Sequence, residues 1–137
     1  MTNALDFSFS KELRLLNAFD YKAVFDHVDG KVSTKEILCL SRKNTLNHPR
    51  LGIIIAKKNV KLAVQRNRIK RVLRESFRHQ QHSLPAVDCI ILAKRGLDKF
   101  DSDELHAQFA SLWLRVNKKF IDHAARSELN PRTQPLQ

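Results

Sequence analysis

The residues best able to do chemistry in this sequence are cations, and they are concentrated in one segment. Nine lysines and arginines fall between Lys57 and Arg78, and Glu75 is the only acid among them. This window carries a charge of +8 out of a net charge of +11 for the 137 residues, whose sequence pI is about 10.1. A local excess of cations is typical of a surface that binds a polyanion, above all nucleic acid.

The same segment has the periodicity of an amphipathic helix, expected from about Lys61 to Gln80. Its apolar side chains share one face at helical spacing: Leu62, Ile69, Val72, Leu73 and Phe77. Asn67 and most of the cations occupy the opposite face, where like charges three and four residues apart repel one another. Phosphates would relieve that repulsion, because arginine forks and the N–H groups of a helix N-terminus both bind anions. We interpret this face as a nucleic-acid surface rather than a merely solubilising one.

Other reactive residue types are too scattered to form a catalytic or metal site. Metal-assisted hydrolysis needs clustered carboxylates, and the one tight acidic group, Asp101, Asp103 and Glu104, falls where a helix cap is expected. Cys39 and Cys89 lie fifty residues apart in apolar runs, which predicts buried free thiols. We expect neither a catalytic residue nor a metal ligand in this chain.

The composition is that of one ordinary folded domain. Hydrophobic residues make up 42% of the chain, no apolar run reaches the roughly 18 residues of a membrane span, and the N-terminus lacks a secretion signal, so we expect a cytoplasmic protein. We expect a flexible segment over residues 1–10, a single domain over 11–122 and a disordered tail over 123–137, where prolines fall among few apolar residues.

Two further helices are expected around the basic one. The first covers residues 18–27, with Asn17 as its N-cap. The last begins at Asp101 or Ser102, with Glu104 as the capping-box partner of Asp101. Its apolar residues have the spacing of a face that packs on a sheet: Leu105, Phe109, Leu112, Trp113, Val116 and Phe120.

Strands are expected at residues 36–41, 51–56 and 89–93, where apolar and β-branched residues run together. A short additional strand could lie near residues 31–34. Residues 43–50, which include an asparagine and a proline, are predicted to form a hairpin loop between the first two strands. The elements together indicate a mixed α+β domain of two layers.

Strands flank the basic helix on both sides, which favours an RNA-binding protein over a helix-turn-helix DNA-binding protein. Tyr21 and Phe25 share one face of the first helix and could stack on unpaired bases. They could equally belong to the core. The residues alone also leave open a structural RNA-binding protein of ribosomal type, which would have the same charge and fold class.

The basic segment resembles the signature of the bacterial ribonuclease P protein family. That signature is a lysine pair, a short spacer containing Ala-Val, and an arginine-rich run, and every part is present: Lys57-Lys58, Ala63-Val64, Arg66-Asn67-Arg68, Lys70-Arg71 and Arg74. The resemblance covers roughly residues 11–120 and includes Arg14-Leu15, Asp20-Tyr21, Val24-Phe25, Leu51-Gly52 and Cys89 to Lys94.

The resemblance implies a four-stranded sheet in α-β-β-β-α-β-α order, with a left-handed β-α-β crossover like that of a ribosomal protein domain. It also implies that the protein is a subunit of an endoribonuclease. A large catalytic RNA subunit would hold the Mg²⁺ ions that remove the 5′ leader from precursor tRNA, and this chain would assist it. Neither a membrane nor DNA is expected as a partner.

Roles for individual residues follow from the same resemblance. Contact with the RNA subunit is expected at Lys57, Lys58, Lys61, Arg66, Asn67, Arg68, Lys70, Arg71 and Arg74. Contact with the leader is expected at Arg14, Tyr21 and Phe25, in a cleft beside the first helix. Leu40 stands at a sheet position where some relatives carry another aromatic residue.

Overall fold

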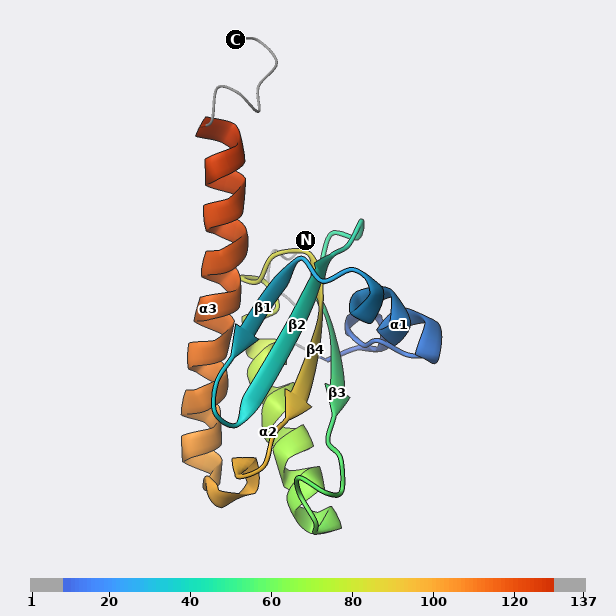
Figure 1. Cartoon of the computed structure of the whole chain (residues 1–137), viewed down its shortest axis with the longest axis vertical. Coiled ribbons are helices and arrows are strands. Elements are labelled where there is room, and N and C mark those ends of the chain that lie inside the picture. Colours follow the sequence, from blue (N-terminus) through green and yellow to red (C-terminus); the bar gives the residue numbers. More distant parts are fainter. Residues whose placement is uncertain (1–8, 130–137) are drawn as a thin grey trace, which may run out of the picture.

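The computed structural model describes residues 9–129, with side chains through Ile121, as a four-stranded sheet with helices on both faces (Figure 1). The expected order of helices and strands is confirmed: α1 (Ala18–Asp26), β1 (Gly30–Ser33), β2 (Ile37–Lys43), β3 (Arg50–Ile54), α2 (Ala63–Gln80), β4 (Val87–Ala93) and α3 (Ser102–Leu129). Two short 3₁₀ turns, Lys11–Leu13 and Leu97–Lys99, precede α1 and α3.

The order of strands in the sheet is β1-β2-β4-β3, so the hairpin predicted over residues 43–50 is wrong. β4 lies between β2 and β3, antiparallel to β2 and parallel to β3. Six of its seven residues are buried, and a strand that is apolar on both faces belongs in the middle of a sheet. Arg50 and Asp88, which are paired in the β3–β4 register, form a salt bridge of 2.7 Å beside this connection.

The connection from β3 through α2 to β4 is a left-handed crossover. In Figure 1 both strands point downward, α2 lies behind the sheet, and β4 lies to the left of β3. Such connections are right-handed in about 98% of sheets. The expectation taken from the family resemblance is therefore confirmed, although the general rule points the other way.

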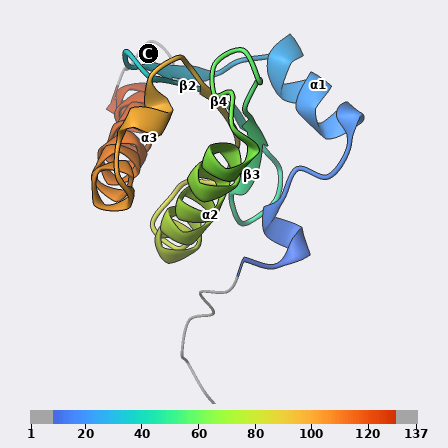
Figure 2. The same cartoon turned by 90° about the horizontal axis from the view of Figure 1, so that it is seen from below.

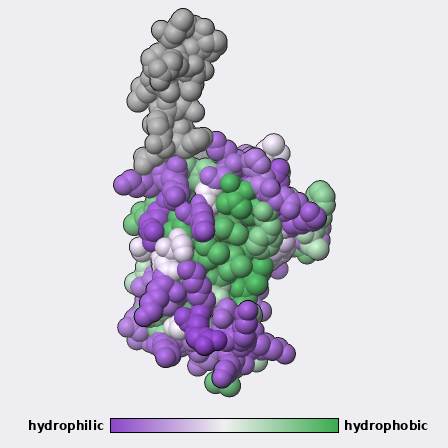
Figure 3. All heavy atoms as spheres, viewed as in Figure 1, coloured by the Kyte–Doolittle hydropathy of each residue, from purple (hydrophilic) through white to green (hydrophobic). Residues whose placement is uncertain are grey.

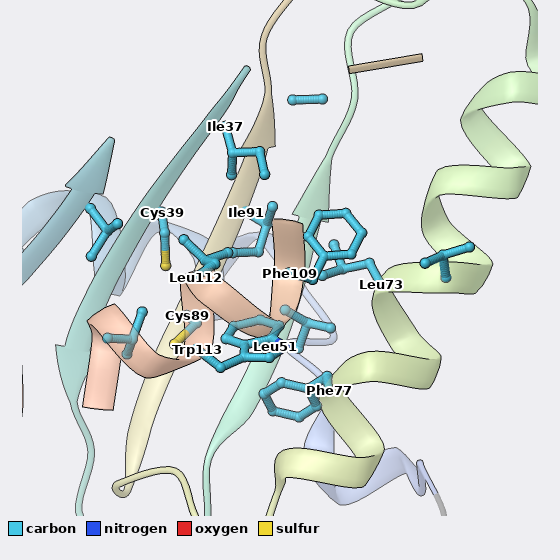
Figure 4. Packing of buried hydrophobic residues seen from close by; sticks show 14 of the residues in the cluster. Ile37, Cys39, Leu51, Leu73, Phe77, Cys89, Ile91, Phe109, Leu112 and Trp113 are labelled. Carbon is cyan, nitrogen blue, oxygen red and sulfur yellow. The ribbon is translucent and has the colours of Figure 1, made fainter. Parts of the chain in front are cut away.

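The core lies between the sheet and the pair α2 and α3 (Figures 2 and 4). Trp113, Phe77 and Phe109 are its largest fully buried side chains, as expected for the two α3 residues. The Trp113 indole donates a hydrogen bond of 2.8 Å to Ser76 Oγ, which joins the two helices. α1 packs on the opposite face around Val24 and Ile90, so the structure has a third layer beyond the predicted two.

Local signals at the helix ends are confirmed, and the structure continues beyond both ends of the range predicted for the domain. Asn17 Oδ1 accepts the Asp20 N–H at 2.9 Å, while Asp101 and Glu104 cap each other's backbone N–H groups. α3 continues to Leu129, past the expected domain end at residue 122, because no proline or glycine interrupts the sequence before residue 131. At the other end Phe9 packs on Phe77 and belongs to the domain. The rest of both expected terminal segments, residues 1–8 and 130–137, lies outside the described residues.

Two observations bear on the remaining expectations. Cys39 and Cys89 are buried free thiols, as predicted. No helix within the described part of the chain is both long and apolar enough to cross a membrane.

Candidate RNA interface

The cations of the basic segment line the loop between β3 and α2 and continue along the solvent side of α2. Lys57, Lys58, Lys61, Arg71 and Arg74 are exposed, Lys70 is half-buried, and the exposed Asn67 lies among them. We call these seven residues the basic face. α2 turns its other side, with Ile69, Leu73 and Phe77, into the core. The expected two-sided character of this helix is therefore confirmed, except at Leu62, which precedes the helix and is 61% exposed.

The basic face is not neutralised within the described residues. Glu75, the one acid of α2, lies 2.7 Å from Arg78 and 3.3 Å from His79. Hydrogen bonding to Arg78, with a smaller contribution from His79, lowers the pKa of Glu75. No carboxylate in the described residues lies within ion-pair distance of a lysine or arginine of the basic face. Repulsion among these cations is thus left for an external anion to relieve.

Arg68 differs from the basic face, because its guanidinium binds the chain itself. It donates to the carbonyl oxygens of Phe100 at 2.8 Å and Asp98 at 3.2 Å. Further hydrogen bonds reach Gln65 Oε1 at 2.9 Å and Ser102 Oγ at 3.4 Å. All three nitrogens of Arg68 are therefore engaged, and they join α2 to the segment that leads into α3.

Arg66 is partly engaged in the same way. One terminal nitrogen, Nη1, donates to the carbonyl oxygens of Val60 at 3.0 Å and Lys61 at 2.8 Å. Within the described residues its other nitrogens make no hydrogen bond, so Arg66 keeps donors for a ligand while it shapes the loop before α2. Sequence periodicity does not reveal these contacts, since most of the acceptors are backbone carbonyls.

The N-terminus of α2 is a second place where donors point outward. The helix begins at Ala63, two residues later than expected, because Leu62 has an extended backbone. Leu62 provides no side-chain cap, so the first-turn N–H groups have no side-chain acceptor. An anion can take that place, and Lys57, Lys58 and Lys61 precede the helix.

A further group of cations lies next to this end of α2 and was missed from the sequence. Lys35, Lys94, Arg95 and Lys99 line a hollow of about 680 Å³ together with Glu36 and Glu104. The hydrogen bond from Asn59 Nδ2 to the Ala93 carbonyl oxygen, at 3.0 Å, joins this region to the loop before α2. Lys94, Arg95 and Lys99 come from the connection between β4 and α3, whereas Lys35 comes from the loop between β1 and β2, so only the fold brings all four together.

The aromatic residues of α1 lie on the other face of the sheet. The Tyr21 ring covers Gly52, where an added Cβ atom would lie 2.8 Å from the ring carbons. Its hydroxyl accepts the Ile53 N–H at 3.2 Å. Tyr21 is therefore half-buried and anchors α1 to β3, whereas Phe25 is 44% exposed. Tyr21 is therefore partly a core residue, whereas Phe25 has the exposed ring that stacking on a base would need.

An apolar floor extends from α1 across the sheet. Leu40, Ile54 and Leu92 are half-buried residues that pack beside Val24 and Ile90. Figure 3 shows a continuous hydrophobic area on this side of the molecule, bordered by hydrophilic residues. Leu40 belongs to this floor, so an aliphatic side chain occupies this position of the sheet.

Arg14 lies at the outer edge of the sheet. Its backbone bridges to Leu51 of β3, one residue from the Gly52 that Tyr21 covers. Its side chain lies 5.1 Å over the Phe9 ring and donates to the Phe9 carbonyl oxygen at 3.1 Å. The structure thus brings Arg14 near Tyr21 along β3 but directs its guanidinium toward Phe9.

Titratable side chains do not gather into a metal site in the described part of the chain. No group of three or more His, Cys, Asp and Glu side chains there could hold a metal ion. The predicted acidic cluster is a helix cap, since Asp101 and Glu104 bind backbone N–H groups.

Known proteins resemble this chain over most of its length. The family model described as Ribonuclease P matches residues 9–117. The ribonuclease P protein component of Pseudomonas aeruginosa is 54% identical over 108 residues, which are 79% of this chain and 80% of that protein. The Chromohalobacter salexigens component is 48% identical over 126 residues, covering 92% and 98% of the two chains.

Solved structures agree with these sequence relatives. The RNase P protein of Staphylococcus aureus superposes with a TM-score of 0.68 at 27% identity, over 79% of this chain and 97% of that one. The RNase P protein of Thermotoga maritima gives a TM-score of 0.66 at 26% identity, over 75% and 96% of the two chains.

Proposed function

Since the chain belongs to the ribonuclease P protein family, we propose that its basic face docks on the catalytic RNA subunit while α1 guides the 5′ leader of precursor tRNA. The family relationship makes the chain a component of ribonuclease P, an endoribonuclease of tRNA 5′ maturation. It also argues against a structural RNA-binding protein with no part in cleavage.

The observation that carries the docking proposal is the unpaired charge of the basic face. Six cations and Asn67 lie on one loop and one side of α2, and no described carboxylate pairs with them. Lysines and arginines that lack such partners bind phosphates and release counterions, which gives an affinity that falls with salt. Asn67 adds an amide for a base edge or a sugar.

Arg66 and Arg68 have a different part in this proposal. Arg68 holds α2 against the segment before α3 and so positions the basic face, rather than contacting RNA itself. Arg66 shapes the loop that carries Lys57, Lys58 and Lys61, and its remaining donors can bind a phosphate.

The leader proposal rests on the face that carries α1. Phe25 offers an exposed ring beside an apolar floor, which suits stacking on unpaired bases. Tyr21 presents its accessible part there while it supports α1, and Arg14 supplies a cation at the β3 edge. The leader would therefore lie across the sheet, on the face opposite α2 and α3.

Phosphodiester hydrolysis is assigned to the RNA subunit with its Mg²⁺ ions. Magnesium favours oxygen ligands with octahedral geometry, and no group of three or more His, Cys, Asp and Glu side chains in the described residues could hold the ion. The protein would contribute by binding and by offsetting phosphate repulsion, which matters most when Mg²⁺ is scarce.

Binding of the RNA subunit at several salt concentrations tests the docking surface. Arg71→Ala is expected to weaken binding and to reduce the slope of log affinity against log salt by about 0.7 to 0.9, because one phosphate contact is lost. Arg115→Ala, which removes another exposed arginine from α3, is the matched control and should leave the slope unchanged. Equal slopes for both variants would show that the basic face is not the docking surface.

A further inference from the structure

The far side of α1 carries an exposed aromatic residue for which neither the fold nor the proposed leader cleft accounts. Phe19 is 78% exposed. At about 100° per residue, Phe19 and Ala23 lie on one side of Val24, whereas Tyr21 and Phe25 lie on the other. A single exposed phenylalanine is ordinary on a protein surface, so a binding role must be argued from the residues around it.

Those surroundings form a small hollow with a charged rim. Phe19 and Ala23 line a space of about 360 Å³ whose charged or titratable members are Lys22, Asp26, His27 and Arg42. Arg42 comes from the end of β2, so the hollow lies between α1 and the sheet. Its volume falls at the lower end of the range for sites that hold one small ligand.

Ion pairs account for the charged side chains that line the hollow, with the exception of one arginine. Lys22 Nζ lies 2.6 Å from Asp26 Oδ2, which neutralises both groups. His27 Nε2 lies 3.0 Å from Asp29 Oδ1. The Arg42 guanidinium makes no ion pair or hydrogen bond with a described residue, and Arg42 is only half-buried.

The reason that Arg42 lacks a partner is visible in the sheet. Its cross-strand neighbour is Asp88 of β4. Both oxygens of that carboxylate already accept hydrogen bonds from Arg50, at 2.8 and 2.7 Å, and Oδ1 also accepts from Asn44 at 2.9 Å. Three hydrogen bonds therefore already reach the carboxylate opposite Arg42, and the Arg42 side chain lines the hollow with Phe19 instead.

We propose that this hollow binds one unpaired nucleotide of the leader, upstream of the nucleotides in the α1 cleft, with its base on Phe19 and its phosphate at Arg42. The inference rests on the proposed leader-binding function and extends it across α1. A bare aromatic ring suits the face of a base, and a free guanidinium fork suits a phosphate. An acidic ligand without a flat ring would leave Phe19 unused, and an apolar ligand would leave Arg42 buried without a partner.

The test uses ribonuclease P reconstituted from the RNA subunit and this protein, with precursor tRNAs whose leaders lengthen by one nucleotide at a time. For the natural sequence we expect one added nucleotide, beyond those in the cleft, to raise affinity by about 5- to 150-fold, the range of base–aromatic stacking. Phe19→Ala and Arg42→Gln should remove or reduce this increase in affinity, and the affinity for shorter leaders should stay the same. Phe19→Trp should retain the increase.

Two controls separate the possible failures. Leu16→Ala removes another exposed apolar side chain near α1 that does not line the hollow, and it should keep the increase in affinity. Phe25→Ala should lower the affinity for every precursor tRNA whose leader is long enough to fill the cleft. If the affinity does not fall, the proposed cleft is wrong, whatever the result for Phe19→Ala. If Phe25→Ala lowers the affinity but Phe19→Ala binds leaders of all lengths as tightly as the natural protein, only the site at Phe19 and Arg42 is refuted. Weaker binding of the isolated RNA subunit by Phe19→Ala would overturn the assignment to the leader.

Discussion

Arg68→Ala should act mainly on the free energy of unfolding of this protein and less on its direct contacts with RNA. The side chain makes four hydrogen bonds within the chain, and the two to backbone carbonyls, at 2.8 and 3.2 Å, join α2 to the approach of α3. A hydrogen bond from a charged donor stabilises a protein by about 1.5–3 kcal/mol. Arg68 is only half-buried, so water can replace part of this network. We expect a net loss of about 2 kcal/mol.

Urea unfolding followed by tryptophan fluorescence measures this loss directly. Trp113 is the only tryptophan, is 1% exposed, and contacts Ser76 of α2, so its emission reports on the packing of α2 against α3. With a denaturant slope of about 2 kcal/mol per molar, the midpoint of Arg68→Ala should fall by about 1 M urea. Arg68→Lys keeps the charge but cannot reach all four acceptors, so it should lose most of the same stability.

Arg71→Ala is the comparison, because Arg71 is exposed and has no partner among the described residues. Its free energy of unfolding should change by no more than about 0.5 kcal/mol, as is typical of surface substitutions. The reasoning is refuted if Arg68→Ala unfolds at the same urea concentration as the natural protein while the salt slope of RNA binding falls. That outcome would make Arg68 a direct phosphate contact.

Two further substitutions test how α1 and the sheet are held. Gly52→Ala places a methyl group 2.8 Å from the Tyr21 ring, so it should lower stability by about 1–3 kcal/mol in urea unfolding and weaken leader binding, with RNA-subunit affinity unchanged. Asp88→Asn should cost about 2–3 kcal/mol in the same assay because Arg50 loses its buried partner. Adding Arg50→Met to that variant should recover part of the loss; a fully additive loss would contradict the ion pair.

The sequence predicted the helices well because their signals are local. Caps at Asn17 and Asp101 and the apolar faces of α2 and α3 depend on residues three or four positions apart. Strand order is a different matter, since alternating burial says nothing about which strand is the neighbour. A complementary pair of charges in two apolar strands, Arg50 and Asp88, was the available signal for β3 beside β4.

The candidate site shows the same division. The basic face could be predicted, because its charges and their helical spacing lie within one short segment of the sequence. The engagement of Arg68 with two carbonyls depends on the fold of residues 98–102, which no periodicity reveals. Tyr21 and Phe25 look alike in sequence, and only the close approach to Gly52 separates an anchoring ring from an exposed one.

Reconstituted cleavage of precursor tRNA at low Mg²⁺ tests most directly whether this chain assists a catalytic RNA. The protein, the RNA subunit and their mixture would each be incubated with substrate, and release of the 5′ leader would be measured. We predict that the protein alone releases none, that the RNA alone is slow, and that the mixture cleaves rapidly. Leader release by the protein alone, or a mixture no faster than the RNA alone, would contradict the proposed function.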